Sequence, residues 1–275
     1  MNQFAKRRTW GPTPNYPNVE AYAPTKEQSE RKLTVIAGPC SVENPEQIHS
    51  IALKVKLSGA THLRGGVFRA GTYPGKHFGY RDESLLNSYY VAAKTNGLEN
   101  IIEVLDYDEE KMKMVSKYCS AFQVGARHMQ NYTLLRSLGR YEKPVFLKRN
   151  PGATIDEWLG SAEHLLVGGV EELYLIERGS SSNATHVRWD LSLSLIPAVK
   201  ALSKVPVIVD AAHGTGRRDL VGPMSLAGIA AGAAGLLVEV HETPEQSLSD
   251  PDQAITPSDF NQLMNHVNLV RAALL

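Results

Sequence analysis

The sequence predicts a single-domain α/β protein, a (β/α)8 TIM barrel with a short N-terminal arm. Three observations point to this fold class. Eight short runs rich in Val, Ile and Leu recur along the chain, amphipathic stretches separate them, and no break in composition divides the 275 residues. Strands that are apolar throughout are buried on both faces, as in parallel sheets, and a barrel of roughly 250 residues is a standard single domain.

The expected strands follow one another at intervals that leave room for a helix between them. In chain order they are Leu33–Gly38, Thr61–Gly66, Asn100–Asp106, Ala121–Ala126, Pro144–Arg149, Glu172–Arg178, Pro206–Ala212 and Gly235–His241. The amphipathic stretches predict helices, among them Pro45–Leu57, Ser84–Asn96, Ile155–Val167 and Leu191–Leu202. Thr154 and the two acidic residues after Ile155 indicate a capped helix start, and Ser258 to Phe260 open a last helix.

The division of the chain follows from the first of these strands. Residues 1–31 contain four prolines and no clear periodicity, so we expect an arm that is extended or packs on the outside. Residues 32–275 form the predicted barrel. A doubly wound open sheet is the alternative, but such a sheet usually has fewer strands and a Gly-rich dinucleotide loop after the first, which this sequence lacks.

Composition excludes several classes of partner. Lys plus Arg and Asp plus Glu number 29 each, so there is no basic excess for nucleic acid and no basic helix for a membrane surface. No run approaches the roughly 18 apolar residues of a membrane span, and the N-terminus lacks a signal-peptide core. Two cysteines, Cys40 and Cys119, do not make a disulfide framework, so a reducing, cytoplasmic setting is expected.

Four potential metal ligands follow strands that are far apart in the sequence. Cys40 comes after the first predicted strand, His213 after the seventh, Glu239 ends the eighth and Asp250 lies in the loop beyond it. If the barrel closes, they share one rim. A thiolate, an imidazole and two carboxylates suit one divalent ion of Mn, Fe, Co or Zn better than Mg²⁺. Taken singly, each has an ordinary alternative, such as a buried apolar cysteine or an aspartate that caps a turn. Cys119, which we expect in the helix before the fourth strand, keeps this ordinary role.

Basic residues converge on the same rim. Arg64, Arg127, Lys148 and Arg178 each lie at a strand end, and four cations at one mouth repel one another unless an anion binds between them. With no net charge on the chain, this arrangement predicts a small acidic ligand. Glu103 among these cations would order a water molecule or pair with an arginine. The turn 214–219 offers a second, weaker phosphate-binding pattern.

The strand ends carry a series of short motifs, which are Gly38-Pro39-Cys40-Ser41, Leu63-Arg64-Gly65-Gly66, Glu103-Val104-Leu105-Asp106, Gly125-Ala126-Arg127, Leu147-Lys148-Arg149, Glu177-Arg178-Gly179, His213-Gly214-Thr215-Gly216, Val238-Glu239-Val240-His241 and Leu248-Ser249-Asp250. In this order, from about residue 33 to 260, the motifs resemble those of the class I DAHP (3-deoxy-7-phosphoheptulonate) synthases, in the branch shared with KDO-8-phosphate synthases. The resemblance implies a metal-dependent transferase that condenses phosphoenolpyruvate (PEP) with an aldose phosphate, erythrose 4-phosphate in DAHP synthases, on the route to aromatic amino acids.

The resemblance also implies residue roles. The metal would bind Cys40, His213, Glu239 and Asp250, and PEP would bind Arg64, Arg127, Lys148 and Arg178. Glu103 would position a water, so that Lys148, Glu103, His213 and Cys40 form the expected catalytic set. Relatives of this family are usually dimers or tetramers, which implies a homo-oligomer.

The acceptor-binding motifs depart from the family pattern. The family's Lys-Pro-Arg-Thr loop becomes Arg69-Ala70-Gly71-Thr72, and an Ile-Arg-Thr motif becomes Ser180-Ser181-Ser182. Gly71 and Ser181 thus stand where cations are expected. For binding of the aldehyde acceptor, the resemblance then implies the residues Arg69, Thr72 and Asp250.

Three interpretations follow from these departures. In the first, erythrose 4-phosphate is the acceptor and the missing cation comes from Lys76, His77 or Arg81. In the second, the acceptor is a different aldehyde of a specialised pathway. A catalytically inactive binding relative is the third, although no metal ligand of the pattern is lost. An unrelated phosphate-binding barrel, such as an isomerase, would not need the Cys40 to Asp250 set.

Overall fold

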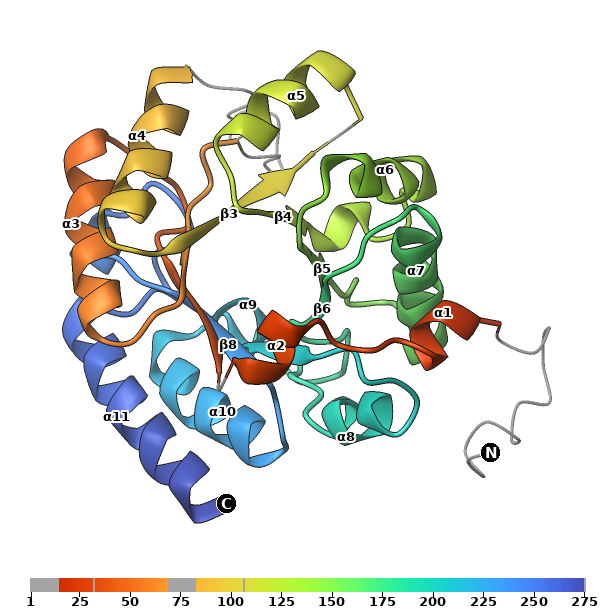
Figure 1. Ribbon diagram of the computed structural model, residues 1–275. Coiled ribbons are helices and arrows are strands. Elements are labelled where there is room, and N and C mark those ends of the chain that lie inside the picture. The colour runs from red at the N-terminus through yellow and green to blue at the C-terminus, as the bar shows by residue number, and fades with distance from the viewer. Residues whose placement is uncertain (1–14, 32, 69–82, 106, 275) are drawn as a thin grey trace.

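The computed structural model describes residues 15–31, 33–68, 83–105 and 107–274, and eight parallel strands in it form a closed barrel in chain order (Figure 1). The strands are β1 (Thr34–Gly38), β2 (His62–Arg64), β3 (Glu99–Val104), β4 (Ala121–Val124), β5 (Val145–Lys148), β6 (Leu173–Glu177), β7 (Val207–Asp210) and β8 (Gly235–Glu239). β1 pairs with β8 over its whole length, which closes the barrel. The predicted fold class is confirmed, and every strand lies within its predicted run except β3, which begins one residue earlier, at Glu99.

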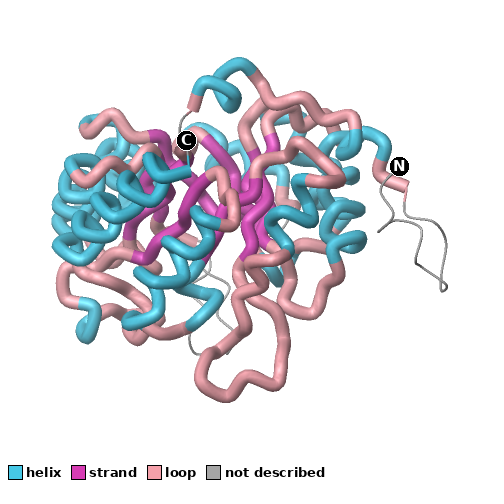
Figure 2. The backbone as a smooth tube through the Cα atoms, turned by 90° about the horizontal axis from the view of Figure 1, so that it is seen from below, coloured by secondary structure: helices cyan, strands magenta, loops and turns pink. Residues whose placement is uncertain are grey.

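Helices form a layer outside the barrel, and Figure 2 shows the strands between them. They are α1 (Pro17–Glu20), α2 (Lys26–Glu30), α3 (Pro45–Leu57), α4 (Glu83–Thr95), α5 (Glu109–Lys117), α6 (Tyr132–Ser137), α7 (Ile155–Val167), α8 (Leu195–Lys200), α9 (Ala211–Thr215), α10 (Arg218–Ala230) and α11 (Pro257–Leu274), with short 3₁₀ turns at Ala126–His128, Leu138–Tyr141 and Pro244–Gln246. The Thr154 side chain accepts from the Glu157 backbone in a capping box that starts α7, as predicted.

Two details of the helix prediction were wrong. The helix expected over Leu191–Leu202 is shorter, because the backbone N–H of Ser192 donates to the Glu177 carboxylate at 3.3 Å and residues 191–194 turn instead. Cys119 was expected in the helix before β4, but α5 ends at Lys117 and Cys119 is buried in the connection that follows.

Two hydrophobic cores hold the barrel together. The smaller one fills the barrel interior with side chains such as Ile36, Phe146 and Ile208, and Phe146 stacks on Tyr174 with ring centroids 4.4 Å apart. The larger one lies between strands and helices and includes the fully buried Trp158 of α7. The barrel is therefore packed rather than hollow, and polar side chains gather only at its ends.

The described part of the N-terminal arm packs against the N-terminal end of the barrel, and in Figure 1 α2 lies at the lower edge of the barrel, near β6 and β8. Gln28 of α2 donates to the Leu173 carbonyl at the start of β6 at 2.9 Å. Tyr22 accepts from the Leu173 backbone at 3.0 Å, and α1 packs on α7. Of the two arrangements expected for the arm, residues 15–31 adopt the packed one.

His62 is buried beneath this arm at the start of β2. The Arg31 guanidinium donates to His62 Nε2 at 3.0 Å, the Thr61 hydroxyl lies 2.7 Å from Nδ1, and the ring packs edge-on against Phe146. Burial, helped by the positive charge of Arg31, lowers the pKa of His62 to about 3. The imidazole is therefore neutral in the folded protein at neutral pH.

This neutral histidine predicts a pH-dependent stability. The unfolded chain binds a proton near pH 6.5 and the folded chain only near pH 3, so the stabilisation is complete above pH 6.5 and is lost as the pH falls between these values. We expect the free energy of unfolding to fall by up to about 1.4 kcal/mol per pH unit there through this group alone. His62→Gln keeps hydrogen-bonding capacity without titrating, so urea unfolding at several pH values should show a shallower slope for the variant. Equal slopes would contradict the interpretation.

Candidate functional site at the C-terminal end of the barrel

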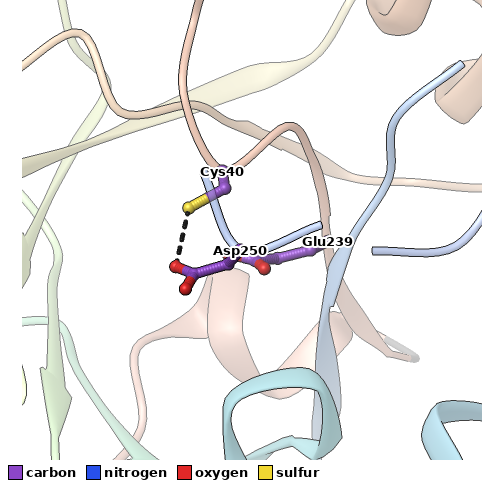
Figure 3. A group of neighbouring side chains, drawn as sticks. All are labelled: Cys40, Glu239 and Asp250. Atoms are coloured by element: carbon purple, nitrogen blue, oxygen red, sulfur yellow. Dashed lines mark hydrogen bonds between the residues drawn. The ribbon is translucent and has the colours of Figure 1, made fainter. Parts of the chain in front are cut away.

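Cys40 is placed by the tight approach of β1 to β2. Gly38 ends β1 with a φ of +150°, and a Cβ there would lie 2.1 Å from the Arg64 carbonyl oxygen, so only glycine fits. Two residues later the Cys40 thiol donates to Asp250 Oδ2 at 3.3 Å. Donor atoms of Cys40, Glu239 and Asp250 all lie within 4.8 Å of one another (Figure 3). Three of the four predicted ligands therefore converge.

Asp250 is held by the loop that follows β8. Its φ is +47°, a left-handed conformation that side chains rarely adopt, and neighbouring contacts fix it. The Ser249 hydroxyl lies 2.7 Å from that of Ser41, and the Leu248 backbone donates to the Glu43 carboxylate at 2.9 Å. The loop is thus clipped to the segment that carries Cys40.

His213, the fourth predicted ligand, is oriented by Asp210 at the end of β7. Its Nδ1 lies 2.9 Å from Asp210 Oδ2, and its Nε2 lies 3.3 Å from Glu239 Oε1. Because Nδ1 faces Asp210, Nε2 is the ring nitrogen on the side of Glu239, and it is the atom through which His213 would bind a metal ion. His213 therefore borders the cluster of Cys40, Glu239 and Asp250 without lying within the same mutual distance.

Glu239 is fully buried and surrounded by donors. Arg64 donates to its Oε1 at 2.5 Å and Gln253 to its Oε2 at 2.6 Å. Burial would raise the pKa of Glu239, but His213, Arg64 and Gln253 lower it to about 2. The carboxylate is ionised at neutral pH, as a metal ligand must be.

Three of the predicted cations surround the Asp210 carboxylate. Lys148 donates to Asp210 Oδ2 at 2.9 Å, and the charge of Asp210 also acts on Arg64 and Arg178. Burial would raise the pKa of Asp210, but His213 and Lys148 hold it well below its usual value. A single buried carboxylate therefore holds Lys148 and acts on two guanidiniums at the mouth.

Arg178 lies at the side of the mouth near Arg127 and Arg188. Its guanidinium lies 5.5 Å from the centre of the Trp189 ring. Burial lowers the pKa of Arg178, and the neighbouring charges of Arg188 and Arg127 lower it further. Arg127 itself is exposed on the 3₁₀ turn after β4. An anion between these guanidiniums would relieve their repulsion.

Glu103 lies near the end of β3, beside the chain that follows β4. Its Oε2 accepts from Gln123 at 3.3 Å, and its Oε1 would be 2.1 Å from a Cβ on Gly125. Gly125 therefore makes room for the carboxylate next to the turn that carries Arg127. The Glu103 carboxylate thus accepts from the Gln123 amide and lies beside the turn with Arg127.

Two further features at the mouth are structural. Arg149 makes a two-pronged contact with Glu177 at 2.5 and 2.8 Å, and both side chains are buried. The turn 214–219 was predicted as a weaker phosphate-binding pattern, but three of its backbone N–H groups already donate within the protein. The N–H of Gly216 bonds to Ala212, that of Arg217 to Thr215, and that of Arg218 to the Asp252 carbonyl, so none of the three faces an anion.

The acceptor-binding loop lies outside the described residues. This holds for Arg69, Gly71 and Thr72, for the candidate substitutes Lys76, His77 and Arg81, and for Asp106. Ser181, by contrast, is described and exposed.

Three described residues at the mouth were missed by sequence reasoning, namely Asp210, Gln253 and Arg188. Asp210 ends a predicted strand, which was a usable signal. Gln253 and Arg188 lie in loops, and only their contacts with Glu239 and Asp250 reveal them.

The donor chemistry fits a divalent metal ion. A thiol after β1 and two carboxylates, on β8 and in the loop after it, form the cluster, and the His213 imidazole on α9 borders it. Asp210 contacts His213, and Gln253 donates to Glu239. Mixed sulfur, nitrogen and oxygen ligands of this kind suit Mn²⁺, Fe²⁺, Co²⁺ or Zn²⁺. Among the helices of the described ranges, none has the length and hydrophobicity needed to cross a bilayer.

Comparison with known proteins identifies the family of the chain. The model of the DAHP synthetase I family matches residues 19–274. The chain belongs to this family. A phospho-2-dehydro-3-deoxyheptonate aldolase of Thermotoga maritima is 39% identical over 242 residues, covering 88% of this chain and 71% of the relative. A 2-dehydro-3-deoxyphosphooctonate aldolase of Desulfotalea psychrophila is 24% identical, covering 90% of this chain and 92% of that relative.

Solved structures of the family have the same fold. The crystal structure of the Thermotoga maritima DAHP synthase superposes with a TM-score of 0.83 at 38% identity, covering 89% of this chain and 70% of that one. A truncated form of the Thermotoga enzyme gives a TM-score of 0.81 and is covered to 88%. The resemblance drawn from the strand-end motifs is confirmed.

The Asp210–His213 contact predicts a loss of metal affinity in Asp210→Asn. The amide has the same shape but cannot carry the charge that fixes the histidine tautomer, so we expect Mn²⁺ or Zn²⁺ to bind about 10- to 100-fold more weakly. Calorimetric titration of the metal would measure this. Asp252→Asn, which changes an exposed carboxylate in the loop after β8, is the matched control. Equal affinities in wild type and Asp210→Asn would refute the orienting role.

Proposed function

We propose that the chain condenses PEP with an aldose phosphate, erythrose 4-phosphate first among them, to give DAHP and inorganic phosphate. The observation that carries the proposal is the junction of two sets of side chains at one mouth. Donors suited to a divalent metal lie beside buried cations suited to PEP, and Arg64 and Asp210 touch both sets. Membership of the DAHP synthetase I family supports the same reaction.

The metal site in this proposal consists of Cys40, His213, Glu239 and Asp250. When bound, the ion supplies a Lewis acid that polarises the aldehyde carbonyl. The charge state of Glu239 and the tautomer set on His213 by Asp210 prepare these two groups for that role. Mn, Fe, Co and Zn all suit the donor set.

The PEP site in this proposal consists of Arg64, Arg127, Lys148 and Arg178. Arg64, Lys148 and Arg178 are buried, so their charges act in a poorly solvated environment and bind the phosphate and carboxylate strongly. Lys148 and Arg178 are close enough to Asp210 to remain fixed before the substrate arrives. Such preorganisation lowers the cost of orienting PEP.

The bond changes in this reaction follow the chemistry of an enol phosphate. The enol carbon of PEP forms a bond with the aldehyde carbon, water adds to the cationic centre left on PEP, and the C–O bond to phosphate then breaks. Glu103 would position that water, since its carboxylate lies beside the turn with Arg127. The cations stabilise the departing phosphate.

Steady-state phosphate release tests the proposal. With Mn²⁺ and PEP, we expect saturable turnover with micromolar erythrose 4-phosphate, and none in Cys40→Ala, which lacks the thiol ligand. Cys119→Ala removes the other cysteine, buried away from the mouth, and should stay active. A panel of other aldehydes accompanies the assay, because Ser181 is exposed where a cation was expected. Turnover only with another aldehyde would replace the acceptor, and an inactive chain that binds neither metal nor PEP would sink the proposal.

The proposed PEP site predicts a selective defect in Arg127→Ala. Loss of a charge-assisted contact should raise the KM for PEP by about 10- to 100-fold and leave the KM for the aldehyde nearly unchanged. Initial-rate kinetics with each substrate varied in turn would separate the two. Arg140→Ala, at an exposed arginine that bonds to the Tyr107 hydroxyl, serves as the control. An unchanged KM for PEP counts against the role of Arg127.

A further inference from the structure

Arg188, in the connection between β6 and α8, reaches the outer side of the candidate metal site. Its Nη2 lies 3.6 Å from Asp250 Oδ1, and its Nη1 donates to Gln253 Oε1 at 3.2 Å. Gln253 in turn donates to Glu239, so the guanidinium is tied to two of the proposed metal ligands. The proposed metal and PEP sites do not include this side chain.

The backbone of Arg188 is fixed independently of its guanidinium. Its N–H donates to the Thr215 carbonyl at 2.8 Å, and the next N–H, of Trp189, donates to Gly214 at 3.2 Å. A Cβ on Gly216 would lie 2.7 Å from the Arg188 Cβ, so the missing side chain lets the two segments meet. The chain after β6 is thereby fastened to α9, and Arg188 extends from a supported position.

The guanidinium itself keeps capacity for a ligand. Its side chain is 44% exposed, and the contact with Asp250 is a single long one rather than a two-pronged pair. A guanidinium has five N–H donors, and the contacts with Gln253 and Asp250 leave donors for an anion. Arg149 shows the contrasting case, since its guanidinium is buried and engaged by Glu177 in two contacts.

Electrostatics around Arg188 also favour an anion. Arg188 and Arg127 both lie close enough to Arg178 for their positive charges to lower its pKa. The buried cations Arg64 and Lys148 lie against Glu239 and Asp210, deeper in the barrel end. A substrate whose carbonyl is near Cys40 and Asp250 would place its far end toward the exposed Arg188.

We infer that Arg188 binds the anionic far end of the aldehyde acceptor, a phosphate monoester, and so selects phosphorylated acceptors. This inference rests on the proposed function and deepens it, because it names the residue that recognises the second substrate. The position of Arg188 compensates for Ser181, which lies in the same connection and offers no charge. The link through Gln253 sets the distance between the phosphate-binding group and the metal ligands.

The inference is tested by comparing two acceptors that differ only in the phosphate. With the Mn²⁺-loaded full chain, Arg188→Gln should lower kcat/KM for erythrose 4-phosphate by about 10- to 100-fold and for erythrose by less than about 3-fold. The KM for PEP should stay unchanged, and Arg188→Lys should be intermediate. If Arg188 only held Asp250 in place, kcat/KM would fall by the same factor for both acceptors, and that result would overturn the inference.

An equilibrium measurement keeps this test separate from the test of the reaction. Erythrose 4-phosphate is titrated into metal-free protein saturated with PEP, where no turnover occurs. We expect wild type to bind it at least about tenfold more tightly than Arg188→Gln. Arg136→Gln, which removes an arginine bonded to His164 on the outer helices, should bind like wild type.

The outcomes of the two measurements are distinct. Weaker binding in Arg188→Gln without phosphate release in wild type would support the anion site and reject the proposed reaction. Equal binding by wild type and Arg188→Gln would reject the anion site, whatever the reaction proves to be.

Discussion

The arrangement of the mouth depends on the Asp210 carboxylate, which is fully buried at the end of β7. A buried charge is costly unless partners surround it, and removing one partner of a buried pair typically costs about 3–5 kcal/mol. Lys148 and His213 are those partners, at 2.9 Å each. Because the same carboxylate orients a proposed metal ligand and a proposed PEP ligand, the two sets of residues cannot move independently.

Around this carboxylate, the charges are organised by depth. Arg64, Lys148 and Glu239 are buried and paired, whereas Arg127 and Arg188 are exposed, and Arg188 meets Asp250 in a single long contact. Buried charges have a fixed geometry and a strong field, which suits the orientation of a reacting group. Exposed guanidiniums can adjust to a ligand, which suits recognition of an acceptor.

The barrel supplies the fixed framework that these charges need. Its interior is filled by side chains such as Phe146 and Tyr174, and the described part of the arm covers the N-terminal end. Glycines at two strand ends allow backbone or carboxylate to approach closely: Gly38 against Arg64, and Gly125 against Glu103. The opposite ends of the barrel thus have separate tasks, with stability at one and the candidate site at the other.

The sequence by itself determined the eight strands, the closed barrel and the rim that gathers Cys40, His213, Glu239 and Asp250. Strand periodicity is local, and parallel strands bring their C-terminal ends together whatever the details of packing. Only the tertiary structure decided which charge pairs with which. Lys148 and Asp210 are 62 positions apart, and Arg188 in the connection after β6 meets Asp250 and Gln253 in the loop after β8. Such pairings depend on how loops are held in space, which no local pattern records.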